Sequence, residues 1–247
     1  TFTFSSDIYS DMIYPGEDLL YEVSYMGIKL GEIRLVTYGP EMYDGKAVIH
    51  TKSFMDSYSG IPFVSLHTTF ETWMDPSITH THKFHGNTKL KDGTWEFVKI
   101  IFDEEDKLFR YEVWKHGRMD TSRTLYTNHN WNDGLSLIFY ARQFVKSKRT
   151  FRVPTIMQND TSYTIINNKN KIENVEISAV DYPVRTVFFN GKAEWSGVYG
   201  VTGNYEGWFS DDDARVPIIA KMKLYIGYAK LELIKWKRGN WAPPRAQ

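Results

Sequence analysis

The chain has 247 residues, and its 30 Lys and Arg balance 30 Asp and Glu, so the formal net charge is zero. This balance lacks the basic excess usual in a general nucleic-acid binder, and the length fits one large all-β domain or two small domains. Cysteine is absent, which excludes disulfides, thiol nucleophiles and cysteine-ligated zinc. No apolar run approaches the ~20 residues of a membrane-spanning helix, so we expect no transmembrane segment.

The start of the sequence carries neither an initiator Met nor a basic and apolar signal pattern. We therefore expect that a removed segment, such as a signal peptide, preceded it, and that residues 1–15 form an irregular N-terminal extension. No Pro-, Ser- or Gly-rich linker divides the remaining chain. The sequence therefore predicts a single domain over residues 1–247.

Strand patterns dominate the chain. Residues 19–25 and 32–36 alternate with period two on either side of Gly27, which predicts a hairpin. Spacings of roughly eight to twelve residues between turn signals predict about a dozen strands in one antiparallel meander. Further turns are predicted at the Asp-Gly pairs of Tyr43–Lys46 and Lys91–Thr94, the Asn-Gly pair of Phe189–Lys192, and the acidic segment Phe102–Lys107.

One segment, Trp131–Lys148, has helical rather than strand periodicity, and Asn132 or Asp133 can cap its start. Its apolar residues spread over a wide arc of the helical wheel. The polar side is formed by Ser136, Tyr140 and Gln143. Such a wide apolar arc predicts that the helix packs deeply against a sheet.

Two predicted strands, Trp95–Phe102 and Val184–Phe189, are apolar on both faces. An antiparallel strand usually keeps one face in water, so a second layer or an apolar cavity is expected beside them. We predict a mostly β fold, in which a single antiparallel meander curves into an open half-barrel with one main α-helix on the concave face.

The histidines are the first candidates for chemistry. His80 and His82 are two residues apart on one strand face and His85 follows closely, a spacing that could hold zinc or another transition metal. His67 or Glu71 on the preceding strand could supply a further ligand. The alternative is a solvent-facing row of Thr and His. Because no known ligand spacing is completed, we predict no metal and no cofactor.

Two carboxylates, Glu194 and Glu206, lie near Trp195, Tyr205 and Trp208, a setting in which a sugar could be stacked and hydrolysed. A chain with 30 acidic residues offers many such pairs, so this interpretation is weaker than a non-enzymatic one. The sequence has no nucleophile elbow and no phosphate-binding glycine loop, and its three consecutive aspartates lack the spacing of a calcium loop. We therefore predict no catalytic residues.

Arg142 shares a sector of the predicted helix with Leu135, Ile138 and Phe139. An unpaired guanidinium in such a place is costly, so it must reach water, a carboxylate or a bound anion. One interpretation is an internal ion pair, with an aspartate of the Asp211–Asp213 turn as a candidate partner. The other is a contact with the headgroup of an amphipathic ligand.

Three segments, Gly16–Leu35, Asn132–Arg142 and Gly207–Leu233, together resemble a bacterial family named domain of unknown function 3108. They match its opening G-E-x-L-x-Y hairpin, its central D-x-L-S…Y-x-R helix and its closing W-x-S-D-D-x-x-R-x-P hairpin. An extra acid could shift the last match from Asp213 to Asp212. The motif positions are Gly16, Glu17, Gly31, Asp133, Ser136, Arg142, Asp213, Arg215 and Pro217.

The resemblance implies an exported protein in the periplasm or outer membrane of a Gram-negative bacterium. It also implies a fold similar to the open β-barrel of periplasmic lipoprotein carriers and outer-membrane lipoprotein receptors. It supplies no reaction, because the family has no established one.

The function we predict is that of a non-enzymatic cell-envelope protein that binds a hydrophobic or amphipathic ligand or a protein partner, with possible membrane-surface association and no nucleic acid. The predicted ligand-binding residues are Leu135, Ile138, Phe139, Arg142, Phe97 and Phe188. One alternative is a carbohydrate-active protein, meaning a glycan binder, hydrolase or lyase. A second is a structural subunit of an envelope assembly.

Overall fold

A computed structural model describes residues 11–61, 64–157, 160–196, 202–224 and 227–246. In these residues one sheet holds 14 strands, and there is one α-helix. The elements in chain order are β1 (Glu17–Tyr25), β2 (Ile28–Tyr43), β3 (Lys46–Ser57), β4 (His67–Met74), β5 (Thr81–Lys89), β6 (Trp95–Asp103), β7 (Leu108–Lys115), β8 (Arg118–Tyr126), α1 (Ser136–Phe144), β9 (Thr150–Met157), β10 (Asp160–Val175), β11 (Val184–Ala193), β12 (Gly203–Ser210), β13 (Pro217–Lys223) and β14 (Tyr228–Lys237).

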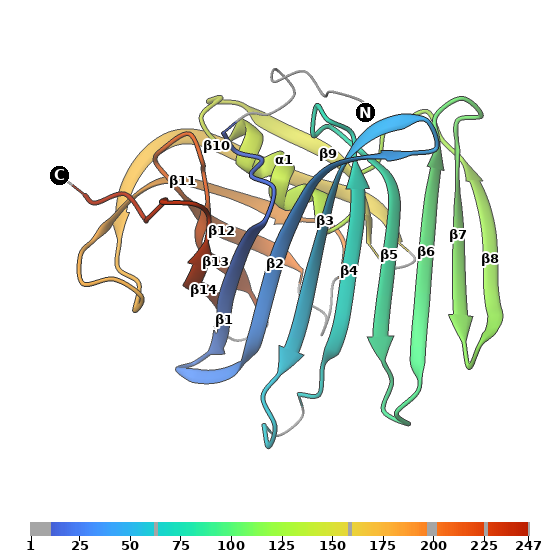
Figure 1. Cartoon of the computed structure of the whole chain (residues 1–247), viewed down its shortest axis with the longest axis horizontal. Coiled ribbons are helices and arrows are strands. Elements are labelled where there is room, and N and C mark those ends of the chain that lie inside the picture. The colour runs from blue at the N-terminus through green and yellow to red at the C-terminus, as the bar shows by residue number, and fades with distance from the viewer. Residues whose placement is uncertain (1–10, 62–63, 158–159, 197–201, 225–226, 247) are drawn as a thin grey trace.

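The strands pair antiparallel in the order β8-β7-β6-β5-β4-β3-β2-β1-β14-β13-β12-β11-β10-β9. The first strand, β1, lies in the middle, because it pairs with β2 on one side and with the last strand, β14, on the other. The chain runs outward from β1 to the edge strand β8, passes through α1 to the other edge, β9, and returns strand by strand to β14 (Figure 1).

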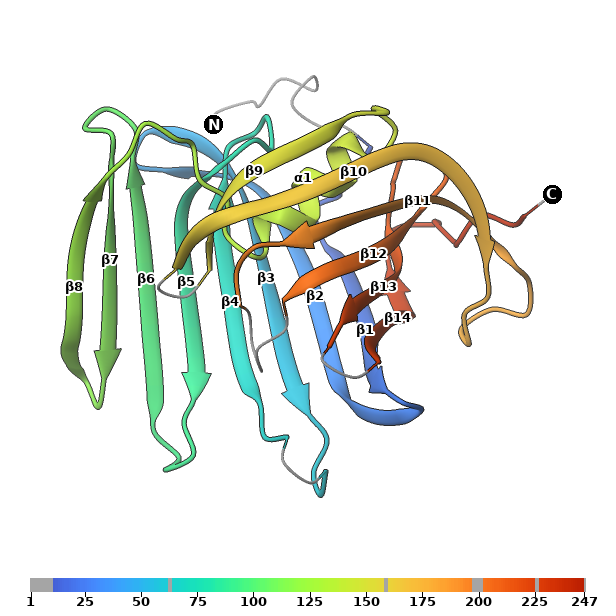
Figure 2. The same ribbon diagram turned by 180° about the vertical axis from the view of Figure 1, so that it is seen from behind.

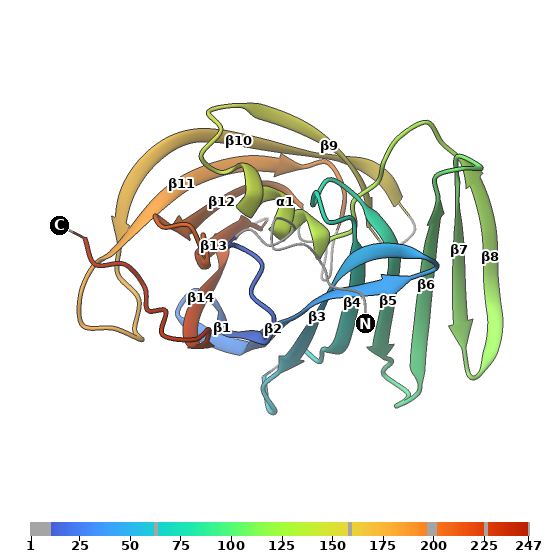
Figure 3. The same ribbon diagram turned by 45° about the horizontal axis from the view of Figure 1, so that its top comes forward.

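The sheet does not close, and it curves so strongly that β9 to β12 arch over α1 (Figures 2 and 3). The helix therefore lies on the concave side of an open half-barrel, and the fold class predicted from the sequence is confirmed.

Most of the predicted turns join neighbouring strands. Asp44 and Gly45 connect β2 to β3 with positive φ angles of 50° and 75°, the conformation that Asp-Gly hairpins favour. The Asp-Gly pair of Lys91–Thr94 joins β5 to β6, and the acidic segment within Phe102–Lys107 joins β6 to β7.

The turn predicted at the Asn-Gly pair of Phe189–Lys192 is wrong, because these residues lie inside β11. The glycine is needed there for space. A Cβ on Gly191 would lie 2.0 Å from the carbonyl oxygen of Ile165 and 2.4 Å from the hydroxyl of Tyr205. This crowding, rather than a tight turn, accounts for the glycine.

The helix is shorter than predicted. It spans nine residues rather than the whole of Trp131–Lys148. Asp133 caps its start as expected, since its Oδ1 accepts hydrogen bonds from the backbone N–H groups of Leu135 (2.7 Å) and Ser136 (3.0 Å). Ser136 is buried at 1% exposure instead of lying on a polar outer side.

The helix packs on two sides. Leu135 and Phe139 join a core cluster with residues of β1 to β4 and β12 to β14. Leu137, Ala141 and Val145 join a second cluster with residues of β9 to β12. The curved sheet thus contacts the helix from both of its halves, which is why a wide apolar arc is needed.

Only one of the two doubly apolar strands is covered on both faces. In β11, Val184 and Val187 are both fully buried although they lie on opposite faces. In β6, Ile100 is buried but Trp95 is 50% exposed, so the second layer expected there is incomplete. Trp95 shares its strand face with Phe97, on the side of β6 opposite to Ile100.

Residues 11–15 contain no strand, yet they are not a loose extension. Met12 and Ile13 are 1% and 4% exposed and belong to the main core cluster. Residues 1–10 of the predicted extension lie outside the described part of the chain.

Candidate functional site

Arg142 of α1 is fully buried and binds Glu17 of β1, which is fully buried as well. Its Nη1 and Nη2 donate to the two carboxylate oxygens of Glu17 at 2.7 and 2.9 Å, and its Nε donates to the carbonyl oxygen of Ala214 at 2.9 Å. Arg238 Nε donates to the same carboxylate at 2.7 Å. One carboxylate therefore serves two guanidinium groups, in the bidentate geometry that suits a buried pair.

This geometry decides between the two interpretations of Arg142. The guanidinium forms an internal ion pair, and the partner is Glu17 rather than an aspartate of the Asp211–Asp213 turn. That turn contacts the helix differently. Arg215 Nη1 donates to the carbonyl oxygen of Gln143 at 2.6 Å, and Asp211 pairs with Lys146 at 3.0 Å.

A second polar network fixes the start of the helix. Asp133 Oδ2 accepts hydrogen bonds from the hydroxyls of Thr72 (2.5 Å) and Thr81 (2.6 Å), which lie on β4 and β5. The Thr81 hydroxyl also lies 2.9 Å from the hydroxyl of Ser136. All four side chains are at most 1% exposed. The carboxylate thus holds the helix N-terminus to the sheet.

The remaining motif positions also serve the fold. Gly16 has a φ of +82°, and its N–H donates to Thr37. A Cβ on Gly31 would lie 2.2 Å from the carbonyl oxygen of Asp56. The carbonyl oxygen of Pro217 accepts a hydrogen bond from Tyr21 at 3.0 Å. Burial first, and then the charge of Glu17, raises the pKa of the Tyr21 phenol well above its usual value.

The contacts that hold the turn are made by Asp212 rather than by Asp213. Asp213 is exposed, whereas Asp212 Oδ1 accepts hydrogen bonds from the Ser210 hydroxyl (2.7 Å) and the Arg215 backbone N–H (2.9 Å). Asp212 Oδ2 accepts a further bond from Trp241 Nε1 at 2.7 Å. Asp212, the alternative position of the family motif, is therefore the aspartate that holds this turn.

The predicted ligand residues on the helix do not form a pocket. Leu135 and Phe139 are 3% and 0% exposed within the core, and Arg142 is neutralised by Glu17. Ile138 is 37% exposed, because the two buried sides of the helix do not include it. Neither of the two best-defined pockets in the described residues is lined by any of these side chains.

The predicted ligand residues on the strands lie in two different places. Phe188 alternates along β11 with Val187 and Phe189 of the second core cluster, packs on Trp208 at 5.3 Å, and borders the core cluster that contains Leu135 and Phe139. Phe97 lies on the outer face of β6, against His85 at 5.1 Å. The structure therefore does not bring Phe97 together with Leu135 and Phe139.

Most residues of the carbohydrate alternative make contacts within the protein. Glu194 pairs with Arg152 at 3.3 Å, and Glu206 lies opposite Lys221 in the sheet. Each aromatic side chain donates an internal hydrogen bond: Trp195 to Thr164 (2.7 Å), Tyr205 to the Ile165 carbonyl (2.8 Å) and Trp208 to Glu173 (2.7 Å). These three rings therefore do not form the exposed row that a glycan would stack on.

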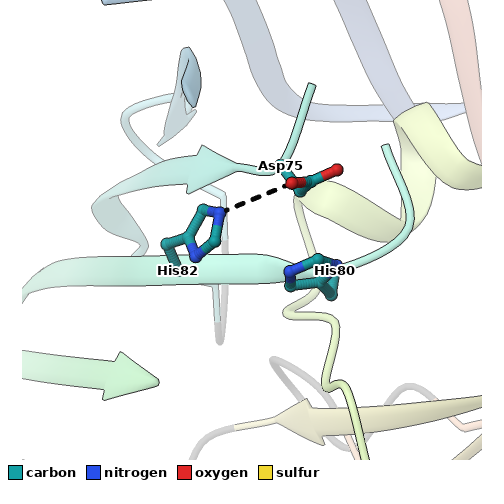
Figure 4. A group of neighbouring side chains, drawn as sticks. All are labelled: Asp75, His80 and His82. Atoms are coloured by element: carbon teal, nitrogen blue, oxygen red, sulfur yellow. Dashed lines mark ion pairs between the residues drawn. The ribbon is translucent and has the colours of Figure 1, made fainter. Parts of the chain in front are cut away.

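The histidines separate into different places. His80 and His82 come together with Asp75 of the β4–β5 connection (Figure 4), while His85 is elsewhere. The further ligands suggested by the sequence are also elsewhere, since His67 pairs with Asp56 at 2.8 Å and Glu71 with His50 at 2.8 Å. His85 lies at the edge of the Trp73 ring on the outer face. Burial first, and then the charge of Lys83, lowers the pKa of His85 to about 4.

The two remaining histidines form a centre with two carboxylates at one end of β4, β5 and β6. Glu104, just after β6, has its Oε1 2.6 Å from His80 Nε2 and 3.0 Å from His82 Nδ1. Asp75 Oδ2 lies 3.7 Å from His82 Nε2, and Asp75 Oδ1 accepts a hydrogen bond from the backbone N–H of Ser77 at 2.8 Å. The contact with His82, helped by Ser77, holds the pKa of Asp75 well below its usual value against the effect of burial.

The sequence could not single out this centre, because its carboxylates come from two separate connections. A pocket of about 280 Å³ adjoins it and includes His80 and Glu104 in its wall. The other lining residues are Thr81, Phe102, Asp103, Lys107, Leu108, Thr127, Asn128, His129, Asn130 and Trp131.

The fold and its two helix-holding networks define a β-barrel-like scaffold with an internal helix. The chain belongs to a family of proteins of unknown function, DUF3108, whose profile matches residues 20–234. Its fold is similar to the crystal structure of a beta-barrel-like protein of domain of unknown function DUF1849 from Brucella abortus. The TM-score is 0.58 at 10% identity, over 92% of this chain and 99% of that chain.

A search of the curated proteins found no match. In the described residues no helix has the length and apolar character needed to cross a bilayer.

Proposed function

We propose that this chain is a non-catalytic cell-envelope protein that binds a protein partner, which adds a strand to the edge strand β8. The observation that carries the proposal is the contrast between the two edges of the sheet. Strand β8 pairs only with β7, and all but one of its nine residues are exposed. An unpaired strand of this kind is a template for an extended segment of another chain.

The other edge is already occupied. The N–H of Asn132 donates to the carbonyl oxygen of Pro154 at 2.9 Å, and the N–H of Ile156 donates back to Asn132 at 2.8 Å. This short parallel bridge covers Pro154–Ile156 on the outer side of β9. The contrast leaves β8 as the better place for an added strand.

Side chains of β8 give a partner something to recognise. Met119, Leu125 and Tyr126 are 48%, 39% and 82% exposed, and the strand also carries the basic residues Arg118 and Arg123. Main-chain hydrogen bonds would supply affinity, and alternating contacts to these apolar side chains would supply specificity.

The filled interior supports a protein partner over an apolar small molecule. The helix occupies the concave side, where Phe139 is fully buried and Arg142 already has a carboxylate partner. The envelope location rests on the resemblance of the sequence motifs to those of exported proteins.

The test uses the absence of cysteine. We would place a single Cys at Thr124 of β8, attach a photo-crosslinker and irradiate the protein in its native envelope. Thr161→Cys, on an exposed position of the interior strand β10, is the matched control. We expect one discrete protein adduct from position 124 and none from position 161.

A second variant tests the strand geometry. Ser122→Pro removes a backbone N–H and stiffens the edge, so it should abolish the adduct formed from position 124 while leaving the fold intact. Equal labelling at positions 124 and 161, or an adduct that survives Ser122→Pro, would contradict strand addition at β8.

A further inference from the structure

Glu104 contacts both buried histidines, and it fixes the tautomer of one of them. Its Oε1 lies 2.6 Å from His80 Nε2 and 3.0 Å from His82 Nδ1, and the first of these contacts is a hydrogen bond. An ionised carboxylate oxygen only accepts, so His80 Nε2 donates to it. A neutral His80 then has its lone pair on Nδ1, which lies 3.0 Å from the hydroxyl of Thr79.

The two histidines lie beside a carboxylate. His82 Nε2 is 3.7 Å from Asp75 Oδ2, and one possible ligand atom from each of Asp75, His80 and His82 lies within 4.8 Å of the other two. Ligands of tetrahedral zinc are about 3.4 Å apart at usual bond lengths, so the three atoms would have to approach one another by at most about 1.4 Å.

We propose that Asp75, His80 and His82 bind a divalent transition-metal ion of the zinc class, and that Glu104, which accepts the Nε2–H of His80, holds that imidazole in the ligating tautomer. Two imidazole nitrogens and one carboxylate oxygen suit zinc better than calcium or magnesium, which take oxygen ligands. A carboxylate that accepts the second N–H of a metal-bound histidine is the usual support for such ligands.

Burial and the protein surface fit this assignment. His80 and His82 are 9% and 4% exposed, so both rings are held in place before an ion binds. The Asp75 side chain is fixed by the backbone N–H and the hydroxyl of Ser77. Because His80 also lines the adjoining pocket of about 280 Å³, a fourth coordination position can be taken by water.

The test is calorimetric titration of the purified, chelator-treated full chain with zinc chloride. We expect one zinc ion per chain. Cobalt(II) bound at the same site should show the visible absorption of a four-coordinate ion. Asp75→Asn keeps the acceptor for the Ser77 turn, and it should weaken zinc binding at least tenfold, as should His82→Gln. Glu104→Gln should weaken binding by about 10- to 100-fold, since it acts through the ligands.

The matched control is His50→Gln. His50 also lies between two carboxylates, Glu41 at 3.2 Å and Glu71 at 2.8 Å, but at a separate place on the outer face. This variant should bind zinc as the parent chain does, and circular dichroism should show that all variants are folded. The absence of zinc binding in the folded parent, or affinity that falls with His50→Gln but not with Asp75→Asn, would overturn the assignment.

Discussion

Replacing Glu17 by Gln should destabilise the protein strongly. Both guanidinium groups that share this carboxylate are buried, with Arg142 at 0% and Arg238 at 8% exposure. Breaking a buried ion pair by removing one partner costs about 3–5 kcal/mol, because the other charge stays buried without compensation. At about 2.1 cal/mol/K of unfolding entropy per residue, a chain of 247 residues has about 0.5 kcal/mol/K. The melting temperature should therefore fall by about 6–10 °C.

The next residue provides the control. Asp18 faces the other side of β1 and forms a bidentate pair with Arg34, at 2.8 Å to Nε and 2.5 Å to Nη2, but this pair is exposed. Exposed pairs contribute about 0.2–1 kcal/mol, so Asp18→Asn should lower the melting temperature by less than about 2 °C. Differential scanning calorimetry measures both variants. Equal shifts for Glu17→Gln and Asp18→Asn would refute the claim that burial makes the Glu17 pair important.

Three further predictions concern the sheet and the turn. Thr72→Val removes a donor to the buried carboxylate of Asp133, so it should lower the free energy of unfolding in urea by about 1.5–3 kcal/mol. Thr51→Val, at a buried hydroxyl without a protein partner, should leave that free energy nearly unchanged, and the reverse order would contradict the network. Asp212→Ala should cost about 1–3 kcal/mol and Asp213→Ala less than about 0.5 kcal/mol, measured in the same way, and equal costs would restore the motif registration at Asp213. Folding lowers the pKa of His85 from 6.5 to about 4, so the unfolded chain takes up a proton at higher pH than the folded protein does. The free energy of unfolding should therefore decrease as the pH falls from 6.5 towards 4, and His85→Phe should reduce this decrease. An unchanged dependence of stability on pH in His85→Phe would show that His85 does not contribute.

Local sequence signals predicted the elements that depend on local physics. Period-two alternation around Gly27 predicted the β1–β2 hairpin, and helical periodicity with Asn132 or Asp133 as cap predicted a helix that contains α1. The burial cost of an unpaired guanidinium predicted that Arg142 needs a partner. These inferences succeed because each rests on residues close in sequence or on a cost that holds in any fold.

The partners themselves could not be predicted, because the topology sets them. Glu17 is 125 residues from Arg142 and meets it only because β1 lies in the middle of the sheet, beneath the helix. Asp75 and Glu104 join His80 and His82 because β4, β5 and β6 are neighbours whose ends coincide. The need of a buried polar group for a partner can be predicted from the sequence, but the fold determines which residue is that partner.

Steric requirements could not be predicted from the sequence either. The Asn-Gly pair in Phe189–Lys192 has the composition of a hairpin turn, yet Gly191 is required by the close approach of Tyr205 and Ile165. The exposed position of Asp213 and the buried contacts of Asp212 differ by one residue, and only the geometry of the turn distinguishes them.

The filled interior is the central claim, because it separates partner binding from lipid carriage. Native mass spectrometry of the protein purified from its native host under non-denaturing conditions tests it most directly. The account predicts the mass of the polypeptide, alone or with one metal ion, and no retained acyl chain. A stoichiometric lipid adduct that survives purification would contradict it, since neither of the two best-defined pockets in the described residues is lined by the helix.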